Sequence, residues 1–210
     1  ATVIVRAGEG ITPIEYHLVQ KLGDGTFGVV WKGAKKERGR QDSFVALKIL
    51  KATASSEESE REIKSLEALK VLSHPLLLLT QGYWMDGDPL VIELEHADGG
   101  SQKERLKMCR KSGMKGIPVG ELLKYFREAS WALDYLHTRQ PQYFLHRDIK
   151  PANILLVKGR AKLADFGLLR QVAGDKSHTH TTGGTEPYMA PRAIVANTTC
   201  PRTELFSLAG

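Results

Sequence analysis

The feature that most constrains this chain is the run His-Arg-Asp-Ile-Lys-Pro-Ala-Asn at residues 146–153, followed by Asp-Phe-Gly at residues 165–167. Asp148 and the amide of Asn153 are five residues apart, and a second carboxylate, Asp165, follows seventeen residues after the first. A carboxylate can hold and deprotonate an attacking hydroxyl group, and amide and carboxylate oxygens are ligands that Mg²⁺ prefers. This spacing is typical of sites that surround the terminal phosphate of a nucleotide.

The composition sets broad limits on the kind of protein. A chain of 210 residues with 41% hydrophobic and 26% charged residues suits one globular domain or two closely packed lobes. No apolar run approaches the roughly 20 residues that span a bilayer, so we expect no membrane span in this segment. Cys109 and Cys200 lack metal-like or redox spacing, which favours two reduced thiols. An enzyme that uses ATP and has reduced thiols would be cytoplasmic, alone or as the cytoplasmic domain of a longer, membrane-anchored protein.

A basic cluster raises the question of nucleic-acid binding. Six basic residues lie within 103–115, but no aromatic residue is interleaved with them. A solvated helix face is therefore favoured over a nucleic-acid site, and we expect no nucleic-acid partner.

The first ninety-five residues predict mostly strands. Three segments rich in β-branched and aromatic residues are separated by glycine and charged turns: residues 16–22, 29–33 and 44–50. One helix interrupts them, with Ser55 or Ser56 as its N-cap. Four apolar residues then recur at helical spacing: Ile63, Leu66, Leu69 and Leu72. A turn at 86–89 precedes a further strand at residues 90–95.

The remainder of the chain predicts mainly helix. Five apolar residues form one stripe on a long helix after the loop at 113–120: Leu122, Phe126, Ala129, Leu133 and Leu136. Two short strands, at 154–157 and 162–164, bracket a hairpin turn at 158–160. We therefore expect an α+β fold in which the residues of the opening motif lie on loops around a small hairpin.

A glycine-rich turn connects the first two predicted strands. Gly23, Gly25 and Gly28 would let the backbone approach phosphate oxygens closely. The same G-x-G-x-x-G pattern opens dinucleotide-binding folds, but those need a helix after the third glycine, and Val29 and Val30 continue as strand. A Walker A loop is excluded because no Lys-Ser/Thr pair follows.

Together these motifs resemble the eukaryotic-like (Hanks-type) serine/threonine protein kinase catalytic domains. The resemblance implies a bilobal, protein-kinase-like fold with an N-terminal extension at residues 1–15, a β-rich N-lobe with one helix at 16–95 and a partial, mainly helical C-lobe at 96–210. The family's later C-lobe helices are absent from this sequence. The implied reaction is transfer of the γ-phosphate of ATP to Ser or Thr hydroxyl groups of protein substrates, with Mg²⁺, or Mn²⁺ in its place, as the metal.

The resemblance assigns roles to the residues of the opening motif. Asp148 would orient the substrate hydroxyl and accept its proton, and Lys150 would neutralise the γ-phosphate. Asn153 and Asp165 would bind the metal. Thr185, in a Gly-Thr pair typical of the serine/threonine class, would bond to Asp148 and Lys150 and shape the acceptor site.

A strand-borne lysine completes the implied phosphate contacts. Lys48 follows Val-Ala-Leu, twenty residues after Gly28, and matches the lysine that contacts the α- and β-phosphates and pairs with a helix glutamate. Glu62 is the best match for that glutamate, with Glu60 and Glu58 as the other registers.

The adenine base is expected at the junction between the last N-lobe strand and the following helix. Leu94 matches the gatekeeper position, and the backbone of residues 95–97 would bond to the base. The complete nucleotide-binding set is Leu22, Gly23, Gly25, Gly28, Val30, Ala46, Lys48, Glu95, Ala97 and Leu155.

A hydroxyl-rich loop runs from Gly167 towards Pro191. We expect activation by autophosphorylation, and thus self-association, at Thr179, Thr181 or Thr182, with Arg147 as the partner of the added phosphate.

Two departures from the family pattern leave alternatives open. Arg192 stands where the family has Glu in Ala-Pro-Glu, and Glu204 stands where it has Asp on the helix below the catalytic loop. Both positions support the loop, so a nucleotide-binding pseudokinase or interaction module is one alternative. A small-molecule phosphotransferase is another, although it would not need the Gly-Thr and Ala-Pro elements.

Overall fold

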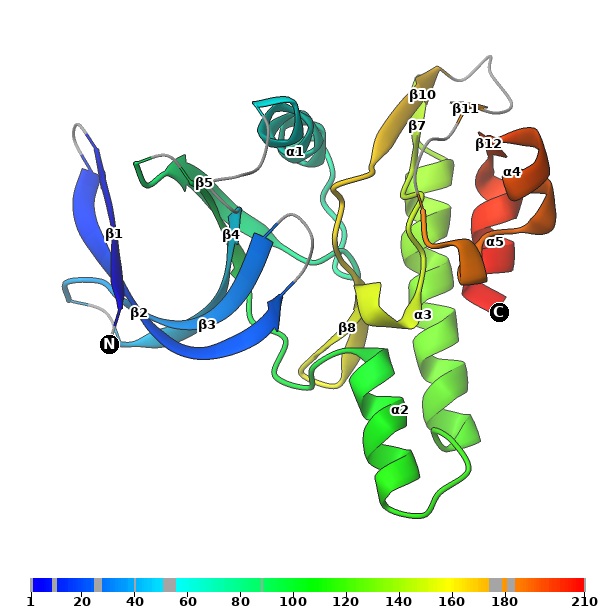
Figure 1. Ribbon diagram of the computed structural model, residues 1–210, viewed down its shortest axis with the longest axis horizontal. Helices are drawn as coiled ribbons and strands as arrows, with labels where there is room; N and C mark the ends of the chain where they lie inside the picture. The colour runs from blue at the N-terminus through cyan, green and yellow to red at the C-terminus, as the bar shows by residue number, and fades with distance from the viewer. Residues whose placement is uncertain are drawn as a thin grey trace. The chain divides into compact units, whose positions relative to one another are not determined.

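The computed structural model describes residues 2–8, 11–24, 28–39, 41–50, 56–87, 89–173, 179–180 and 184–209. The chain divides into two compact units, one of Ala1–Ile63 with Leu79–His96 and one of Lys64–Leu78 with Ala97–Gly210. The first unit is built on an antiparallel sheet and the second mainly on helices (Figure 1). This architecture confirms the predicted α+β class.

The first unit contains a six-stranded sheet of order β1-β2-β3-β4-β6-β5. Its strands are β1 (Val3–Gly8), β2 (Ile11–Asp24), β3 (Gly28–Lys36), β4 (Ser43–Leu50), β5 (Thr80–Met85) and β6 (Leu90–Glu95). The four predicted strands fall within β2, β3, β4 and β6. Strand β5 was not predicted, because Gly82 interrupts its pattern where the pairing with β6 shifts register. A core of five buried residues packs within this sheet: Ile4, Tyr16, Val45, Leu47 and Val91.

Strand β1 lies in the segment expected as an N-terminal extension. It pairs with β2 and brings Arg6 to 3.6 Å from the carboxylate of Glu93, which is fully buried on β6. The same carboxylate accepts hydrogen bonds from the Tyr16 hydroxyl at 3.0 Å and from Lys35 Nζ at 2.8 Å. Burial and the Glu93 carboxylate raise the pKa of the Tyr16 phenol. A buried carboxylate needs such partners, so β1 belongs to the fold of this unit as an edge strand that also supplies Ile4 to the core.

Five α-helices lie in the described residues: α1 (Ser56–Leu69), α2 (Gln102–Lys111), α3 (Val119–His137), α4 (Pro191–Ala196) and α5 (Pro201–Ala209). The division between the two units falls within α1. Helix α1 ends at Leu69, so Leu72 of the predicted pattern lies beyond it. Helix α2 begins with a capping box, in which Ser101 Oγ accepts from the Glu104 N–H and the Glu104 carboxylate accepts from the Ser101 N–H. Among the described helices, none is long and apolar enough to cross a membrane.

Three short strand pairs complete the second unit. They are β7 (Gln142–Leu145) with β10 (Arg170–Ala173), β8 (Ile154–Val157) with β9 (Arg160–Leu163), and β11 (Thr179–His180) with β12 (Thr198–Thr199). The β8–β9 pair is the predicted hairpin, with Lys158 and Gly159 in its turn. Glu128 of α3 is buried and accepts the Ala161 N–H at 2.7 Å, which fastens the hairpin to α3.

The predicted apolar stripe on α3 is only partly correct. Ala129, Leu133 and Leu136 are fully buried, but Leu122 is 41% and Phe126 is 43% exposed. Tyr125 and Ala132 are buried in their place. With 100° between successive residues, the buried arc of α3 is centred towards Tyr125 and Ala132, so Leu122 and Phe126 lie at its border. The periodicity of the apolar residues predicted the helix correctly, but it did not predict which residues lie at the centre of the buried face.

An ion pair between α2 and α3 should make stability depend on pH. Arg105 donates to both oxygens of Glu121, at 2.6 and 2.8 Å, and lowers the pKa of Glu121 to about 2 from an ordinary 4.5. Because the folded-state pKa is the lower one, this stabilisation is complete above about pH 4.5 and is lost as the pH falls towards 2. We expect the difference in Tm between the wild type and Glu121→Gln to shrink over that window in thermal melts. A difference that stays constant down to pH 2 would contradict this coupling.

Candidate active site

The loop between β7 and β8 is fixed by a buried histidine. His146 is fully buried, and its ring lies 5.2 Å from that of Phe166. Its Nδ1 accepts the Asp148 N–H at 3.3 Å, so in the neutral ring the proton is on Nε2, which donates to the Ala164 carbonyl at 3.0 Å. The histidine therefore ties the loop to the segment that contains Asp-Phe-Gly.

The carboxylate of Asp148 lies at the centre of a polar cluster. Its Oδ1 accepts a hydrogen bond from Thr185 Oγ1 at 2.7 Å. Its Oδ2 accepts from Asn153 Nδ2 at 2.8 Å and lies 2.7 Å from Lys150 Nζ. Lys150 Nζ also donates to Thr185 Oγ1 at 2.9 Å, so the threonine hydroxyl links the base to the lysine. The structure thus brings together four of the residues singled out in the sequence, in an arrangement that can hold a hydroxyl group beside a cationic side chain.

Asn153 and Asp165 supply oxygen atoms suited to a hard cation. Asn153 Nδ2 donates to both the backbone and side-chain oxygens of Asp148, at 2.9 and 2.8 Å, which fixes the amide and leaves its Oδ1 without a partner among the described residues. The Ala164 N–H bonds to the Asn153 carbonyl at 2.9 Å, next to Asp165. No group of three His, Cys, Asp or Glu side chains able to hold a metal occurs in the described part of the chain. The amide oxygen of Asn153 and the carboxylate of Asp165 are ligand types that fit Mg²⁺, which usually takes few protein oxygens and completes its shell with phosphates and water.

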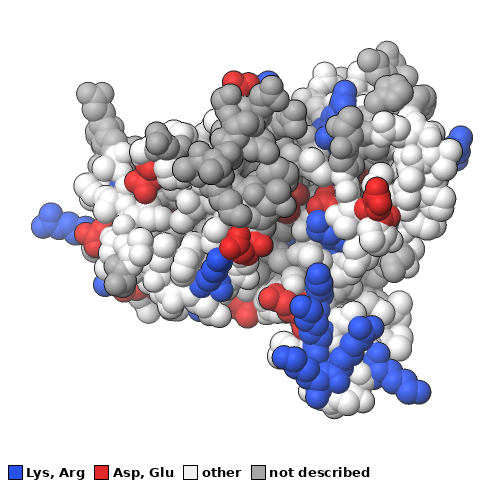
Figure 2. Space-filling model, viewed as in Figure 1, with Lys and Arg blue, Asp and Glu red and all other residues white. Residues whose placement is uncertain are grey.

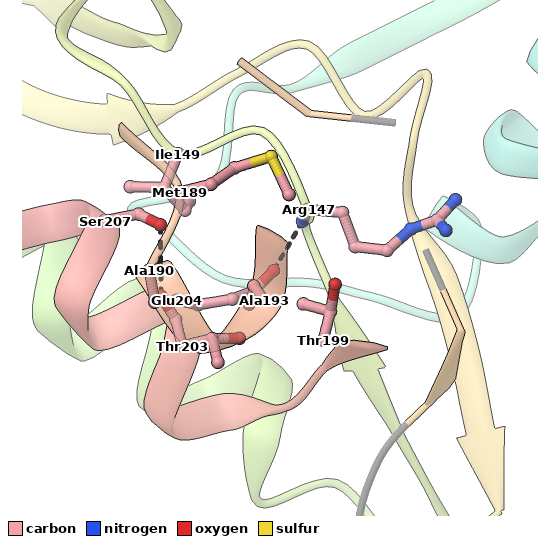
Figure 3. A pocket seen from close by; sticks show the side chains of 9 residues that line it. All are labelled: Arg147, Ile149, Met189, Ala190, Ala193, Thr199, Thr203, Glu204 and Ser207. Carbon is pink, nitrogen blue, oxygen red and sulfur yellow. Dashed lines mark hydrogen bonds between the residues drawn. The ribbon is translucent and has the colours of Figure 1, made fainter. Parts of the chain in front are cut away.

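A buried glutamate supports the loop from α5. Glu204 is 2% exposed and its Oε1 accepts the backbone N–H of Arg147, while its Oε2 lies 2.7 Å from His137 Nε2 on α3. Figure 3 shows Glu204 pointing at the Arg147 backbone across a small pocket. The additional methylene, relative to Asp, is accommodated without loss of the backbone hydrogen bond. Sequence reasoning assigned no role to His137, because only the fold brings it to Glu204, 67 residues away.

Two loop residues adopt left-handed backbone conformations. Arg147 has φ of 67° and Asp165 has φ of 62°. Non-glycine residues in this region are disfavoured and cluster at functional sites, where the surrounding contacts impose the conformation. At Arg147 those contacts are the Glu204 carboxylate and the Leu168 carbonyl, which accepts from the guanidinium Nε at 2.7 Å.

In the first unit, the expected phosphate-contacting lysine lies on a central strand. Lys48 of β4 is half-buried and pairs with Val30 of β3 on one side. Directly opposite residues and residues two apart on one strand point to the same face, so Val30, Ala46 and Lys48 share one face of the sheet. Ala46 is buried, and its small apolar side chain suits contact with a flat ring next to the charged end of Lys48.

The comparison with known proteins decides the family. The model of the protein kinase domain matches residues 16–209. The chain belongs to the protein kinase family. Serine/threonine-protein kinase sid1 of Schizosaccharomyces pombe is 34% identical over 195 residues, which cover 92% of this chain and 39% of that protein. The human serine/threonine-protein kinase Nek11 is 30% identical over 198 residues, which cover 92% of this chain and 30% of that protein. The serine/threonine-protein kinase dst1 of Dictyostelium discoideum is 32% identical over 195 residues, which cover 92% of this chain and 25% of that protein.

The chain therefore spans well under half the length of these curated relatives. Family membership accounts for the bilobal α+β fold, and protein kinases use ATP and a divalent metal ion.

The other expected nucleotide contacts of the kinase family are divided between the two units. The first unit contains Leu22, which is 39% exposed near the end of β2, and Glu95, whose carboxylate accepts the Leu79 N–H at 2.7 Å. The second unit contains Ala97, whose carbonyl accepts the Gly100 N–H at 3.2 Å, and Leu155 on β8.

Part of the expected site lies outside the described residues. Gly25 belongs to the segment 25–27, of which nothing is described. Glu62 and Glu58 lie in α1, but their side chains are outside the described part, whereas Glu60 is exposed. The expected pairing of Lys48 with a helix glutamate therefore stays a prediction.

The glycine-rich turn has two glycines that the structure describes, Gly23 and Gly28, and the space around them differs sharply. A Cβ atom at Gly28 would lie 2.6 Å from the Ile49 carbonyl oxygen, while a Cβ at Gly23 would meet nothing within 4 Å. We expect Gly28→Ala to lower the free energy of unfolding by about 1–3 kcal/mol, because β3 must shift away from β4. Gly23→Ala is the matched control and should cost less than about 1 kcal/mol in urea denaturation. Equal losses in the two variants would contradict the steric explanation.

Arg192, the second departure from the kinase pattern, is exposed on α4. It forms no ion pair with any residue that the structure describes. Unlike Glu204, it makes no hydrogen bond to the catalytic loop among the described residues, and nothing there shows it disturbing the Asp148 cluster.

Proposed function

We propose that this chain is a serine/threonine protein kinase domain that transfers the γ-phosphate of ATP to Ser and Thr hydroxyl groups of proteins. The observation that carries the proposal is the Asp148 carboxylate held by Thr185, with Lys150 bonded to both. Relatives at 30–34% identity that carry the name serine/threonine-protein kinase support it. No observation in the described residues favours the pseudokinase alternative.

The residues of the second unit suggest how the transfer proceeds. Asp148 accepts a hydrogen bond from the substrate hydroxyl and takes its proton as the hydroxyl oxygen bonds to the γ-phosphorus. The bond between the γ-phosphorus and the oxygen that links it to the β-phosphate breaks, and ADP leaves with the electron pair of that bond. Lys150 neutralises negative charge on the transferred group. Asn153 and Asp165 would hold Mg²⁺, or Mn²⁺, which supplies positive charge at the phosphates.

The residues of the first unit would hold the nucleotide. Lys48 contacts the α- and β-phosphates, and Gly23 and Gly28 let the loop backbone approach them. Ala46 and Val30 pack against the adenine ring beside that lysine. In this assignment, residues 16–95 serve as the N-lobe and residues 96–210 as part of the C-lobe.

The proposed phosphate donor also suggests a location. ATP is available in the cytoplasm, and both cysteines are free, with Cys109 buried. A cytoplasmic site of action, alone or as the cytoplasmic part of a longer protein, is consistent with both.

Phosphorylation of the hydroxyl-rich loop between Gly167 and Pro191 should raise activity. Burial and, to a smaller extent, the positive charge of Arg170 lower the pKa of the Arg147 guanidinium, and an added phosphate would supply the opposite charge. Thr179 lies on β11, paired with Thr199, while Thr181 and Thr182 lie outside the described residues. Changing all three threonines to alanine should abolish self-incorporated phosphate and lower activity at least about fivefold in a kinase assay. Unaltered incorporation would contradict this mode of activation.

The proposed reaction can be tested by following the phosphate. The protein is incubated with γ-labelled ATP, Mg²⁺ and a generic basic protein, and the acceptor is identified after acid hydrolysis. We expect phosphoserine and phosphothreonine. Label on a sugar or amine but never on protein would instead indicate a small-molecule phosphotransferase.

A further inference from the structure

A stripe of basic side chains covers one side of α2. Lys103, Lys107, Arg110 and Lys111 follow one another at i, i+4, i+7 and i+8, which places them on a single face of the helix. All four are exposed, as is Lys115 in the loop that follows. Figure 2 shows the basic side chains gathered over this helix. We refer to these five residues as the α2 basic stripe.

The carboxylates near the stripe are already engaged elsewhere. Glu104 closes the capping box with Ser101, and Glu121 binds Arg105 through both oxygens. Asp98 accepts the Lys158 N–H at 2.7 Å. Within the part of the chain that the structure describes, no member of the stripe has an ion-pair or hydrogen-bond partner. Five positive charges therefore face solvent without compensation from any residue that the structure describes.

The stripe does not stabilise the helix that carries it. Like charges at i, i+3 and i, i+4 repel one another, and the stripe contains three such pairs: Lys103 with Lys107, Lys107 with Arg110, and Lys107 with Lys111. Packing of α2 relies on the opposite side, where Cys109 is fully buried. An anionic ligand would relieve the repulsion and would find the charges already displayed.

We infer that the α2 basic stripe is a docking surface for an acidic segment of a protein partner. From residue 103 to residue 111 a helix rises about 12 Å, which an extended peptide spans with about four residues. Carboxylates in such a segment can reach successive cations of the stripe. Met108 is 59% and Met114 is 41% exposed beside the stripe, and methionine offers adaptable apolar contact to varied side chains.

Two other anionic partners fit the surface less well. Single-stranded nucleic acid is usually bound with aromatic stacking platforms, and no aromatic residue lies within 103–115. Binding to an anionic membrane by a helix in the interface requires a free apolar face, but the side of α2 opposite the stripe is packed around Cys109. An acidic polypeptide needs neither feature.

The inference is tested by binding in the absence of ATP, so the result does not depend on phosphoryl transfer. Fluorescence anisotropy with a labelled peptide of Asp, Glu and Gly should show binding that weakens as salt is raised. The variant Lys103→Gln, Lys107→Gln, Arg110→Gln, Lys111→Gln should bind at least about tenfold more weakly. Its thermal midpoint should be no lower than that of the wild type, because the substitutions remove like-charge pairs.

A matched control removes the same charge elsewhere. Lys36, Arg38, Lys64 and Arg202 are also exposed, and changing all four to Gln should leave the affinity for the peptide within about twofold. Equal weakening in both variants would show that only net charge matters and would overturn the docking surface. So would absence of peptide binding, or tighter stripe-dependent binding of duplex DNA or of phosphatidylserine vesicles.

Discussion

Replacing Asp148 with asparagine should lower kcat for phosphate transfer by about 10²–10⁴-fold, the range expected for loss of a general base. The asparagine can still accept the hydrogen bond from Thr185, but it cannot take the proton of the substrate hydroxyl. It also leaves Lys150 without the negative charge that lies 2.7 Å from its Nζ. Because the KM for ATP depends on other residues, it should change little.

The measurement for Asp148 is steady-state transfer to a serine peptide, with the free energy of unfolding followed in parallel. Asp134→Asn makes the same chemical change at an exposed position on α3 and should keep full activity. If Asp148→Asn retained more than about a tenth of kcat, the carboxylate would not be the base.

Replacing Glu204 with alanine should lower the free energy of unfolding by about 2–4 kcal/mol. The change removes the acceptor of the Arg147 N–H and the partner of His137, and it leaves both groups unpaired in a buried environment. Since Arg147 precedes the proposed base, the catalytic loop should loosen and kcat should fall as well. Urea denaturation gives the stability, and transfer to a serine peptide gives the activity.

Two variants separate hydrogen bonding from side-chain volume at this position. Glu204→Gln keeps one carbonyl oxygen for the Arg147 N–H and an amide for His137, so it should lose less stability than the alanine variant. Leu205→Ala alters a neighbouring side chain that is 48% exposed and should cost less than about 1 kcal/mol. If Glu204→Ala were as stable as the wild type, α5 would not be anchoring the loop.

The sequence was most informative where chemistry requires fixed residue types at fixed spacing. Asp148, Lys150 and Asn153 lie within six residues of one another, so their proximity follows from the chain itself. Thr185 is 37 residues away from Asp148, and its place in the site was predicted only from the Gly-Thr pair that the sequence shares with serine/threonine kinases. The structure places its hydroxyl in hydrogen-bond contact with the carboxylate.

The contacts that hold the fold together were harder to foresee, because they join segments that are distant in sequence. Tyr16 and Glu93 bond across 77 residues, and nothing local to Glu93 predicts that a glutamate on β6 is buried. The pairing of β1 with β2, which brings Arg6 to this carboxylate, also depends on the completed sheet. Residue patterns give the strands, whereas the partners of a buried charge depend on tertiary structure.

The most direct test of the kinase account measures nucleotide binding and single-turnover transfer in the same samples. The wild type and Asp148→Asn are each mixed with Mg²⁺ and γ-labelled ATP, and then with a serine peptide or with its tyrosine counterpart. We predict that both proteins bind ATP, that only the wild type labels a peptide rapidly, and that the labelled peptide is the serine one. Nucleotide binding without Asp148-dependent labelling of either peptide would contradict the account and indicate a pseudokinase.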